Sequence, residues 1–407
     1  MTDDYKVGNK QFPKDFLFGT AISAHQVEGN NQYSDWWHWE KNKKLLERSG
    51  IACDHYSCFE NDFKLAKDVL HNNSYRQSIE WARIEPQKGK INQRQIRHYL
   101  KVLKKLKEMG FSTIVTLHHF TNPNWFTNEG GFTKSENIIY FNNYTRICVE
   151  KFGDYIDFWI IINEPNIYAF MAFFLGIWPP QQKSTVLTLR VLLNLAKAHK
   201  AAYKLIHTKY PFSKVSSAIQ MTYFKAKGKL NKLIATFESF LANDLFITFT
   251  QKYHDFIAIN YYTLHESSLK DIRINKFNVD EIGIAFDGEK NDLGWPSYPQ
   301  GIYHVVNNAW QKYKLPILIT ENGIADHDDS RRSNYIVDHL RWIFKAMNEG
   351  VNVIGYTYWT LMDNFEWHNG RKAKFGLFET NYKTLERVAR KSAHVYGEIC
   401  RTGILPS

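Results

Sequence analysis

The chain has 407 residues, of which 44% are hydrophobic and 15% aromatic, so it holds enough apolar side chains for a large core and is not intrinsically disordered. The formal net charge is +11, but no zinc-ligand spacing, RNA-binding signature or basic-aromatic array accompanies it, and we expect no nucleic-acid partner. Four cysteines are too few for a disulfide scaffold, which predicts free thiols and a reducing compartment.

The N-terminal residues contain no apolar stretch of the kind that marks a signal peptide. The most apolar short segment, residues 170–177, is far shorter than the ~20 residues that cross a bilayer. We therefore expect a soluble, cytoplasmic protein without a membrane partner.

Eight segments have the composition of β-strands, because they are apolar and rich in β-branched or aromatic residues. In chain order they are residues 16–24, 74–79, 111–117, 158–162, 215–219, 256–262, 317–320 and 353–359. Helical patterns lie between them. The clearest are residues 93–109, followed by Gly110, and residues 335–347, followed by Gly350, in which apolar side chains recur at helical spacing.

Strands that alternate with helices in this way predict an α/β fold, a (β/α)8 TIM barrel. No linker or break in composition divides the chain, so we expect one domain over residues 1–407. An open doubly wound sheet is the competing interpretation. It requires a glycine-rich phosphate-binding turn after its first strand, and Phe18-Gly19-Thr20 does not provide one.

Polar residues stand at the ends of several predicted strands, and in a barrel the carboxyl ends of the strands carry the reactive side chains. These residues are His25, Gln26, Arg76, His118, His119, Asn163, Glu164, Asn260, Tyr261, Tyr262 and Glu321, together with Trp359. So many polar strand ends at one rim predict a shared polar pocket.

Two glutamates stand out among these residues. Glu164 follows the apolar residues 158–162 and precedes Pro165, and Glu321 follows the apolar residues 315–320 and precedes an Asn-Gly pair. Each carboxylate is therefore held where a buried strand meets a loop. Two such carboxylates can supply the acid/base and nucleophilic groups that cleave a glycosidic bond.

Six motifs in a fixed order carry a resemblance to a known family. They are Phe16-Leu17-Phe18-Gly19-Thr20-Ala21, Ser23-Ala24-His25-Gln26-Val27-Glu28-Gly29, Tyr75-Arg76, Asn163-Glu164-Pro165, Thr320-Glu321-Asn322-Gly323, and Tyr358-Trp359 with Asp363-Asn364-Phe365-Glu366-Trp367. From Phe12 to the region near Ile404 the chain resembles glycoside hydrolase family 1, the β-glucosidase and β-galactosidase family. Residues 34–40, 78–81 and 119–123 are closest to its archaeal-type branch.

The resemblance implies a role for each catalytic position. Glu164 would be the general acid/base, which suits a pKa raised towards neutrality. Glu321 would be the nucleophile, with Arg76 paired to it and lowering its pKa, and with Tyr262 donating a hydrogen bond to it. The family retains the anomeric configuration, which requires the two carboxyl groups to lie about 5–5.5 Å apart.

The family's sugar-binding positions match as well. The resemblance implies that hydroxyl groups of the terminal sugar bind Gln26, His119, Asn163, Glu366 and Trp367, and that Trp359 stacks beneath the sugar ring. Glu366 would accept bonds from neutral hydroxyls and repel a phosphate, which predicts neutral hexosides.

We expect neither a metal nor an organic cofactor. His118 and His119 are the most suggestive pair for a metal site, but neighbouring residues on a strand point to opposite faces and do not readily share one ion.

Two stretches depart from the family pattern. Residues 219–255 and 262–294 are shorter than the family usually has, which predicts short loops after the fifth and sixth strands and an open site for the leaving group. The expected function is that of a retaining exo-β-glycosidase acting on small β-glucosides, β-galactosides or short oligosaccharides. A transglycosidase, a 6-phospho-β-glycosidase and an inactive sugar-binding protein remain alternatives.

Overall fold

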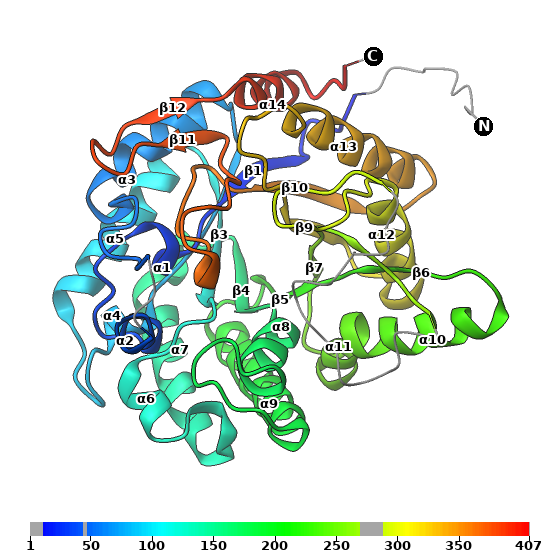
Figure 1. The fold of residues 1–407 in the computed structure, drawn as a ribbon. Coiled ribbons are helices and arrows are strands. Elements are labelled where there is room, and N and C mark those ends of the chain that lie inside the picture. The colour runs from blue at the N-terminus through cyan, green and yellow to red at the C-terminus, as the bar shows by residue number, and fades with distance from the viewer. Residues whose placement is uncertain (1–10, 44–46, 269–287, 407) are drawn as a thin grey trace.

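The computed structural model describes residues 11–43, 47–268 and 288–406. Its centre is a closed barrel of eight parallel strands, in the order β1-β10-β9-β7-β5-β4-β3-β2 (Figure 1). The strands are β1 (Leu17–Ala21), β2 (Ser74–Ser78), β3 (Ser112–His118), β4 (Phe158–Asn163), β5 (Lys214–Gln220), β7 (Ile257–Asn260), β9 (Ile317–Asn322) and β10 (Val353–Trp359). The predicted (β/α)8 barrel is confirmed.

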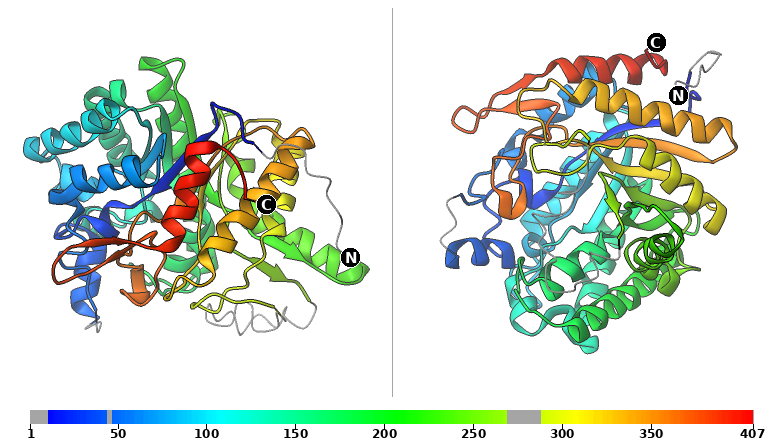
Figure 2. Two further views of the ribbon diagram at one scale, coloured as in Figure 1. Left: turned by 90° about the horizontal axis from the view of Figure 1, so that it is seen from above. Right: turned by 45° about the vertical axis from the view of Figure 1, so that its right-hand side comes forward.

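Helices cover the outside and the rim of this barrel (Figure 2). They are α1 (Ala24–Val27), α2 (Asp35–Asn42), α3 (His55–Lys64), α4 (Trp81–Ile84), α5 (Gln93–Glu108), α6 (Asn124–Asn128), α7 (Ile138–Phe152), α8 (Pro165–Ala169), α9 (Thr185–Lys209), α10 (Lys229–Ser239), α11 (Leu245–Thr250), α12 (Gln300–Tyr313), α13 (Arg332–Asn348) and α14 (Lys391–Thr402). Two small sheets are added to the barrel: β6 (Tyr223–Lys225) with β8 (Leu264–Glu266), and β11 (Phe378–Thr380) with β12 (Arg387–Ala389).

The barrel strands are apolar because both of their faces are covered. In β4, four consecutive residues from Trp159 to Ile162 are fully buried, as expected for a strand between a barrel interior and a layer of helices. The helix α5 shows the complementary pattern, with one buried face and a start capped by Asn92, whose side chain accepts bonds from two backbone N–H groups. Gly110 follows α5 with φ of +75°, which glycine adopts without strain.

The first predicted strand is too long. Residues 16–24 were expected to be one strand, whereas β1 ends at Ala21 and α1 begins at Ala24. Ser78 of β2 accepts a hydrogen bond from the backbone N–H of Ala24 at 2.7 Å and so holds the chain where it turns inward. Gln26 therefore reaches the barrel mouth from a short helix and not from a strand.

The connection between β5 and β7 contains a longer apolar segment than residues 170–177, which were expected to be the most apolar one. Lys229–Thr250, which contains α10 and α11, is long and apolar enough by length and composition to cross a membrane, and 28% of its apolar window is buried. Polar residues at 231–232, 238–239 and 243–244 interrupt the apolar ones, so no unbroken run marks this segment in the sequence. One such helix is weak evidence for a membrane span.

Two expectations about organisation stay predictions: the single domain and the short loops after the fifth and sixth strands. Much of the second loop, residues 269–287, lies outside the described residues.

Candidate active site

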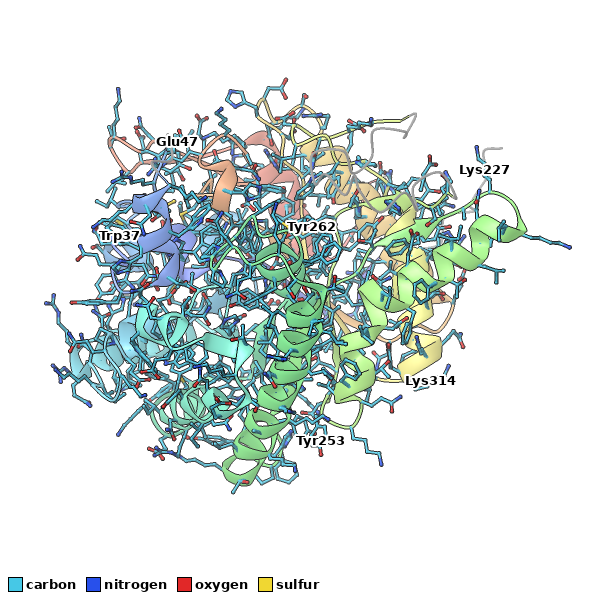
Figure 3. The ribbon with its side chains drawn as sticks, turned by 60° about the horizontal axis from the view of Figure 1, so that its bottom comes forward. Trp37, Glu47, Lys227, Tyr253, Tyr262 and Lys314 are labelled. Carbon is cyan, nitrogen blue, oxygen red and sulfur yellow. The ribbon has the colours of Figure 1, made fainter. Side chains whose placement is uncertain are left out.

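The predicted site residues gather at the carboxyl ends of the barrel strands. Glu164 follows β4, Glu321 is in β9, Arg76 is in β2 and Trp359 ends β10. These four side chains are almost completely buried. Figure 3 shows Tyr262, which follows β7, near the middle of the molecule and far from Lys227.

Glu164 stands between strand and helix. It precedes Pro165, the first residue of α8, and has φ of +43°, a left-handed conformation that is unusual for a residue other than glycine. Such backbone conformations persist where the surrounding structure holds them, and they concentrate at functional sites. The amide of Asn260 donates a hydrogen bond of 2.7 Å to Oε1 of Glu164 and fixes the carboxyl group.

Both oxygens of Glu321 have a donor. The guanidinium of Arg76 forms an ion pair with Oε1, and the hydroxyl of Tyr262 donates to Oε2 at 2.5 Å. Arg76 also donates to Oδ1 of Asn163 at 2.6 Å, so one guanidinium links the ends of β2, β4 and β9. Both predicted partners of Glu321 are therefore in contact with it.

The two carboxyl groups have different electrostatic surroundings. Burial raises the pKa of Glu164 to about 8, and the charge of Glu321 adds to this shift. Burial raises the pKa of Glu321 as well, whereas the charge of Arg76 and the hydrogen bond from Tyr262 lower it. The charge of Arg76 lowers the pKa of both groups, but its ion pair is with Glu321. Glu321 therefore ionises first, and Glu164 keeps its proton to a higher pH.

One detail of the prediction changes. Arg76 does lower the pKa of Glu321, as expected, but burial outweighs it, and the pKa lies above its ordinary value. The cost of removing a carboxylate from water is therefore larger here than the gain from its cation.

A second polar group lies beside the carboxyl pair. Gln26 donates hydrogen bonds to Oε2 of Glu366 at 3.0 Å and to Oδ1 of Asn364 at 3.2 Å. Burial raises the pKa of Glu366 to about 8, and the charge of Glu321 contributes. At neutral pH the uncharged form of Glu366 is therefore favoured, which differs from the charged acceptor that the sequence suggested.

Aromatic rings form a layered wall on this side of the site. The ring of His119 lies parallel to Trp359, at 5.9 Å and 20°, and to Trp367, at 6.0 Å and 16°. His25 covers Trp367 as well, at 5.7 Å and 5°. Nε2 of His119 lies 3.2 Å from the amide nitrogen of Asn163. Flat apolar faces with polar atoms at their edges suit a sugar ring, which has hydroxyls around its edge and an apolar C–H face.

His118 and His119 point in opposite directions, as the alternation of a strand predicts. Nε2 of His118 lies 3.1 Å from Oδ1 of Asn122, and its ring contacts Phe132, outside the polar pocket. Among the described residues no group of three or more His, Cys, Asp or Glu side chains could hold a metal ion. The absence of a metal from the reaction stays a prediction.

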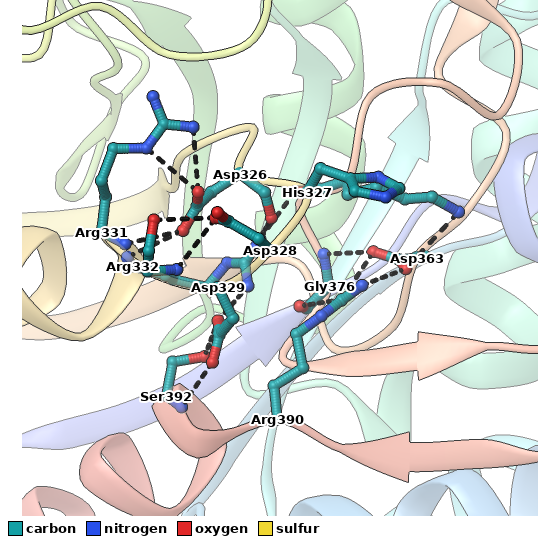
Figure 4. A network of polar contacts seen from close by, with 12 residues as sticks. Asp326, His327, Asp328, Asp329, Arg331, Arg332, Asp363, Gly376, Arg390 and Ser392 are labelled. Carbon is teal, nitrogen blue, oxygen red and sulfur yellow. Dashed lines mark hydrogen bonds and ion pairs between the residues drawn. The ribbon is translucent and has the colours of Figure 1, made fainter.

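The segment that carries Glu366 and Trp367 is held by a buried ion pair. Arg390 donates to both oxygens of Asp363, at 2.9 and 2.8 Å, and the backbone N–H of Gly376 donates to Oδ1 (Figure 4). A bidentate arginine fixes both the position and the orientation of its partner. Asp363 therefore anchors the loop after β10 at its start.

The sequence assigned no role to two residues of the site. Asn260 was read only as part of a strand end, but its amide contacts Glu164 and Asn163, and Oδ1 accepts a bond from Thr320. Asn364 was read only as part of a motif, but it accepts a bond from Gln26. A buried amide at a strand end beside Tyr262 is a signal that could have identified Asn260.

Comparisons with known proteins agree with this geometry. The family model described as glycosyl hydrolase family 1 matches residues 8–242 and 224–404. Beta-glucosidase A of Acetivibrio thermocellus is 30% identical over 441 residues, which covers 96% of this chain and 98% of that protein. A beta-galactosidase of Pyrococcus woesei is 30% identical over 496 residues and covers 95% of this chain and 96% of that protein.

A solved structure, the beta-glycosidase from Pyrococcus horikoshii, superimposes on the chain with a TM-score of 0.89. The two chains are 36% identical, and the match covers 98% of this chain and 97% of that one.

Proposed function

Because the chain belongs to glycosyl hydrolase family 1, we propose that it is a retaining, exo-acting β-glycosidase that removes terminal neutral hexosyl groups such as β-glucosyl and β-galactosyl. It is a glycoside hydrolase, since the family hydrolyses O-glycosidic bonds. One observation carries the proposal. Arg76 and Tyr262 contact Glu321 and not Glu164, which separates the two carboxyl groups into one that ionises and one that keeps its proton.

In the first step, the ionised Glu321 attacks the anomeric carbon of the sugar. The bond from that carbon to the glycosidic oxygen breaks, and Glu164 donates its proton to that oxygen, so the alcohol leaves uncharged. The products are a glycosyl ester on Glu321 and an ionised Glu164. A pKa of about 8 keeps Glu164 protonated at neutral pH, which this step requires.

In the second step, water attacks the anomeric carbon, Glu164 accepts its proton, and the ester bond to Glu321 breaks. The ester carries no charge, so the charge of Glu321 that raises the pKa of Glu164 is absent while the intermediate exists. The pKa of Glu164 is therefore lower in the intermediate, where it acts as a base, than in the free enzyme, where it acts as an acid. Two displacements at one carbon retain the configuration.

The contacts of Lys374 favour neutral sugars over phosphorylated ones. Nζ of Lys374 lies 3.7 Å from Oδ2 of Asp363 and 5.1 Å from the ring centre of Tyr382, so its charge is already paired. Glu366 and Gln26 offer hydrogen bonds suited to hydroxyl groups. The preference for neutral sugars does not rest on repulsion between an ionised Glu366 and a phosphate, because the pKa of Glu366, about 8, leaves it mostly uncharged at neutral pH.

A panel of nitrophenyl α- and β-glycosides, with and without a 6-phosphate, tests the proposal. We expect release of nitrophenol from the unphosphorylated β-glycosides, a β-configured first product by NMR, and loss of activity in Glu321→Ala. Glu398→Ala, a change of an exposed glutamate paired with Arg401, is the matched control. An inverted product, full activity in Glu321→Ala, or faster hydrolysis of the phosphorylated glycosides would contradict the proposal.

A cytoplasmic location is also a proposal, supported by four free cysteines. Titration of the denatured protein, isolated under alkylating conditions from its own cells, is expected to find four thiols. A disulfide in that material would contradict a reducing compartment.

A further inference from the structure

The helix α10 turns apolar side chains towards solvent. Leu230, Leu233 and Phe237 are 55%, 69% and 62% exposed, and Phe240 and Leu241 continue the same face. Their spacing of three or four residues puts them on one side of the helix. We call these five residues the α10 stripe.

Polar contacts fix this orientation. On the opposite side of the helix, Glu238 accepts a hydrogen bond from Ser267, and Ala235 is buried. Further along, the buried amide of Asn243 bonds to both the N–H and the C=O of Thr222, at 2.9 Å each. The apolar face therefore points outward because the polar face is bound to the body of the protein.

Cations lie beside the first part of the stripe. Lys227, Lys229 and Lys232 are exposed beside its first residues, and none of the three pairs with a carboxylate among the described residues. Figure 3 shows Lys227 at the outer end of this projecting region. The one acidic residue of α10, Glu238, is on the inner side. An exposed apolar stripe flanked by lysines is complementary to a surface that is apolar within and negative at its edge.

We propose that the α10 stripe docks the protein on an anionic lipid surface, with the helix lying in the plane of the headgroups. The leucine and phenylalanine side chains enter the boundary of the acyl chains, and the three lysines contact lipid phosphates. The segment lies on the membrane and does not span it. Asp244 accepts a hydrogen bond from Tyr313 and pairs with Lys312, and both contacts would be lost if the segment left the barrel.

The charge beside the α10 stripe also makes a second copy of the chain a poorer partner than an anionic lipid surface. A two-fold dimer through the stripe would place the same lysines of both copies at one interface. Like charges brought together in this way repel, whereas an anionic surface neutralises them.

Co-sedimentation with vesicles tests the proposal. We expect the protein to sediment with vesicles that contain phosphatidylglycerol, at least about tenfold more than with pure phosphatidylcholine, and to be released by high salt. Two variants separate the contributions: Leu233→Glu with Phe237→Glu removes the apolar contact, and Lys227→Gln, Lys229→Gln and Lys232→Gln together remove the charge. Each variant should lower binding at least about tenfold.

The matched control is Ile139→Glu in α7, which adds a carboxylate at a side chain that is 53% exposed. It should bind vesicles like the wild type. Glycosidase activity reports on folding, since none of the changed residues lies in the active site. Wild-type binding by either variant, or no preference for the anionic vesicles, would overturn the proposal. So would a dimer in sedimentation that the Glu variant converts to a monomer, because it would identify a second copy as the occupant.

Discussion

The side-chain amide of Asn260 donates a hydrogen bond of 2.7 Å to Oε1 of Glu164, the proposed acid/base. This bond favours the ionised carboxylate and lowers the pKa of Glu164 against the effect of burial. Asn260 also bonds to Asn163 at 3.1 Å, and Asn163 in turn accepts from Arg76. Through Asn163, Asn260 therefore connects Glu164, the proton donor, to Arg76, the cation paired with the nucleophile.

Replacing Asn260 with Ala is expected to raise the pKa of Glu164 above its value of about 8, because a bond to the ionised form is lost. The alkaline limb of kcat/KM, which follows the protonated form of Glu164 in the free enzyme, should move to higher pH. A pH–rate profile measures this shift. Asn243→Ala, which removes a buried amide outside the site, should leave the limb in place, and an unmoved limb in Asn260→Ala would contradict the assignment.

Glu164→Gln removes the proton donor without changing the shape of the side chain. The loss should be about 10²- to 10⁴-fold in kcat/KM for a glycoside with a basic alcohol as leaving group, since that oxygen needs the proton most. A dinitrophenyl glycoside, whose leaving group departs as an anion, should lose much less in the same assay. Equal losses on both substrates would mean that Glu164 does not act as the acid.

Tyr262→Phe removes one donor from Glu321 and leaves Arg76 in place. A hydrogen bond to a charged group is worth about 1.5–3 kcal/mol, so kcat/KM should fall about 10- to 150-fold. The pKa of Glu321 should rise, because the lost bond favours its ionised form, and the acidic limb of the pH–rate profile should move up. Tyr261→Phe is the control, since the hydroxyl of Tyr261 bonds to the carbonyl of Tyr298, and it should keep the acidic limb in place.

The buried Glu366 makes stability depend on pH. Its pKa is about 8 in the folded protein and near 4.5 in the unfolded chain, so the unfolded state releases its proton first as pH rises. The favourable contribution of the protonated form is complete below about pH 4.5 and is lost as pH rises to about 8. The melting temperature of Glu366→Gln minus that of the wild type, measured by calorimetry, should therefore increase steadily as the pH rises from about 4.5 to about 8. A difference in melting temperature that stays constant with pH would contradict the raised pKa.

Much of the barrel follows from local patterns. Each strand is a short apolar run, because a barrel strand is covered on both faces, and the end of each run marks the rim where Glu164 and Glu321 stand. The predicted first strand was too long because Ile22 and Ala24 continue the apolar pattern beyond Ala21, and only the contact of Ala24 with Ser78 shows that the chain has turned.

The site was less predictable where it depends on distant contacts. Asn260 acts through Glu164, which is 96 positions away, and no local pattern marks such a pair. The pKa of Glu321 could not be predicted from a local pattern either, because burial raises it and Arg76 lowers it, and the packed structure sets which effect is larger. The outward face of α10 was also missed, since an amphipathic pattern predicts that the apolar face turns towards the core, whereas in α10 it turns towards solvent.

Glu321 is the proposed nucleophile, and a mechanism-based label identifies the residue that attacks the sugar. A 2-deoxy-2-fluoro-β-glucoside with a dinitrophenyl leaving group forms the glycosyl enzyme quickly and releases it slowly. After incubation and proteolysis, mass spectrometry should find one fluorosugar on the peptide that contains Glu321, with one equivalent of dinitrophenol released in a burst. A label on another residue, or steady turnover of this glycoside without any covalent adduct, would show that Glu321 is not the nucleophile.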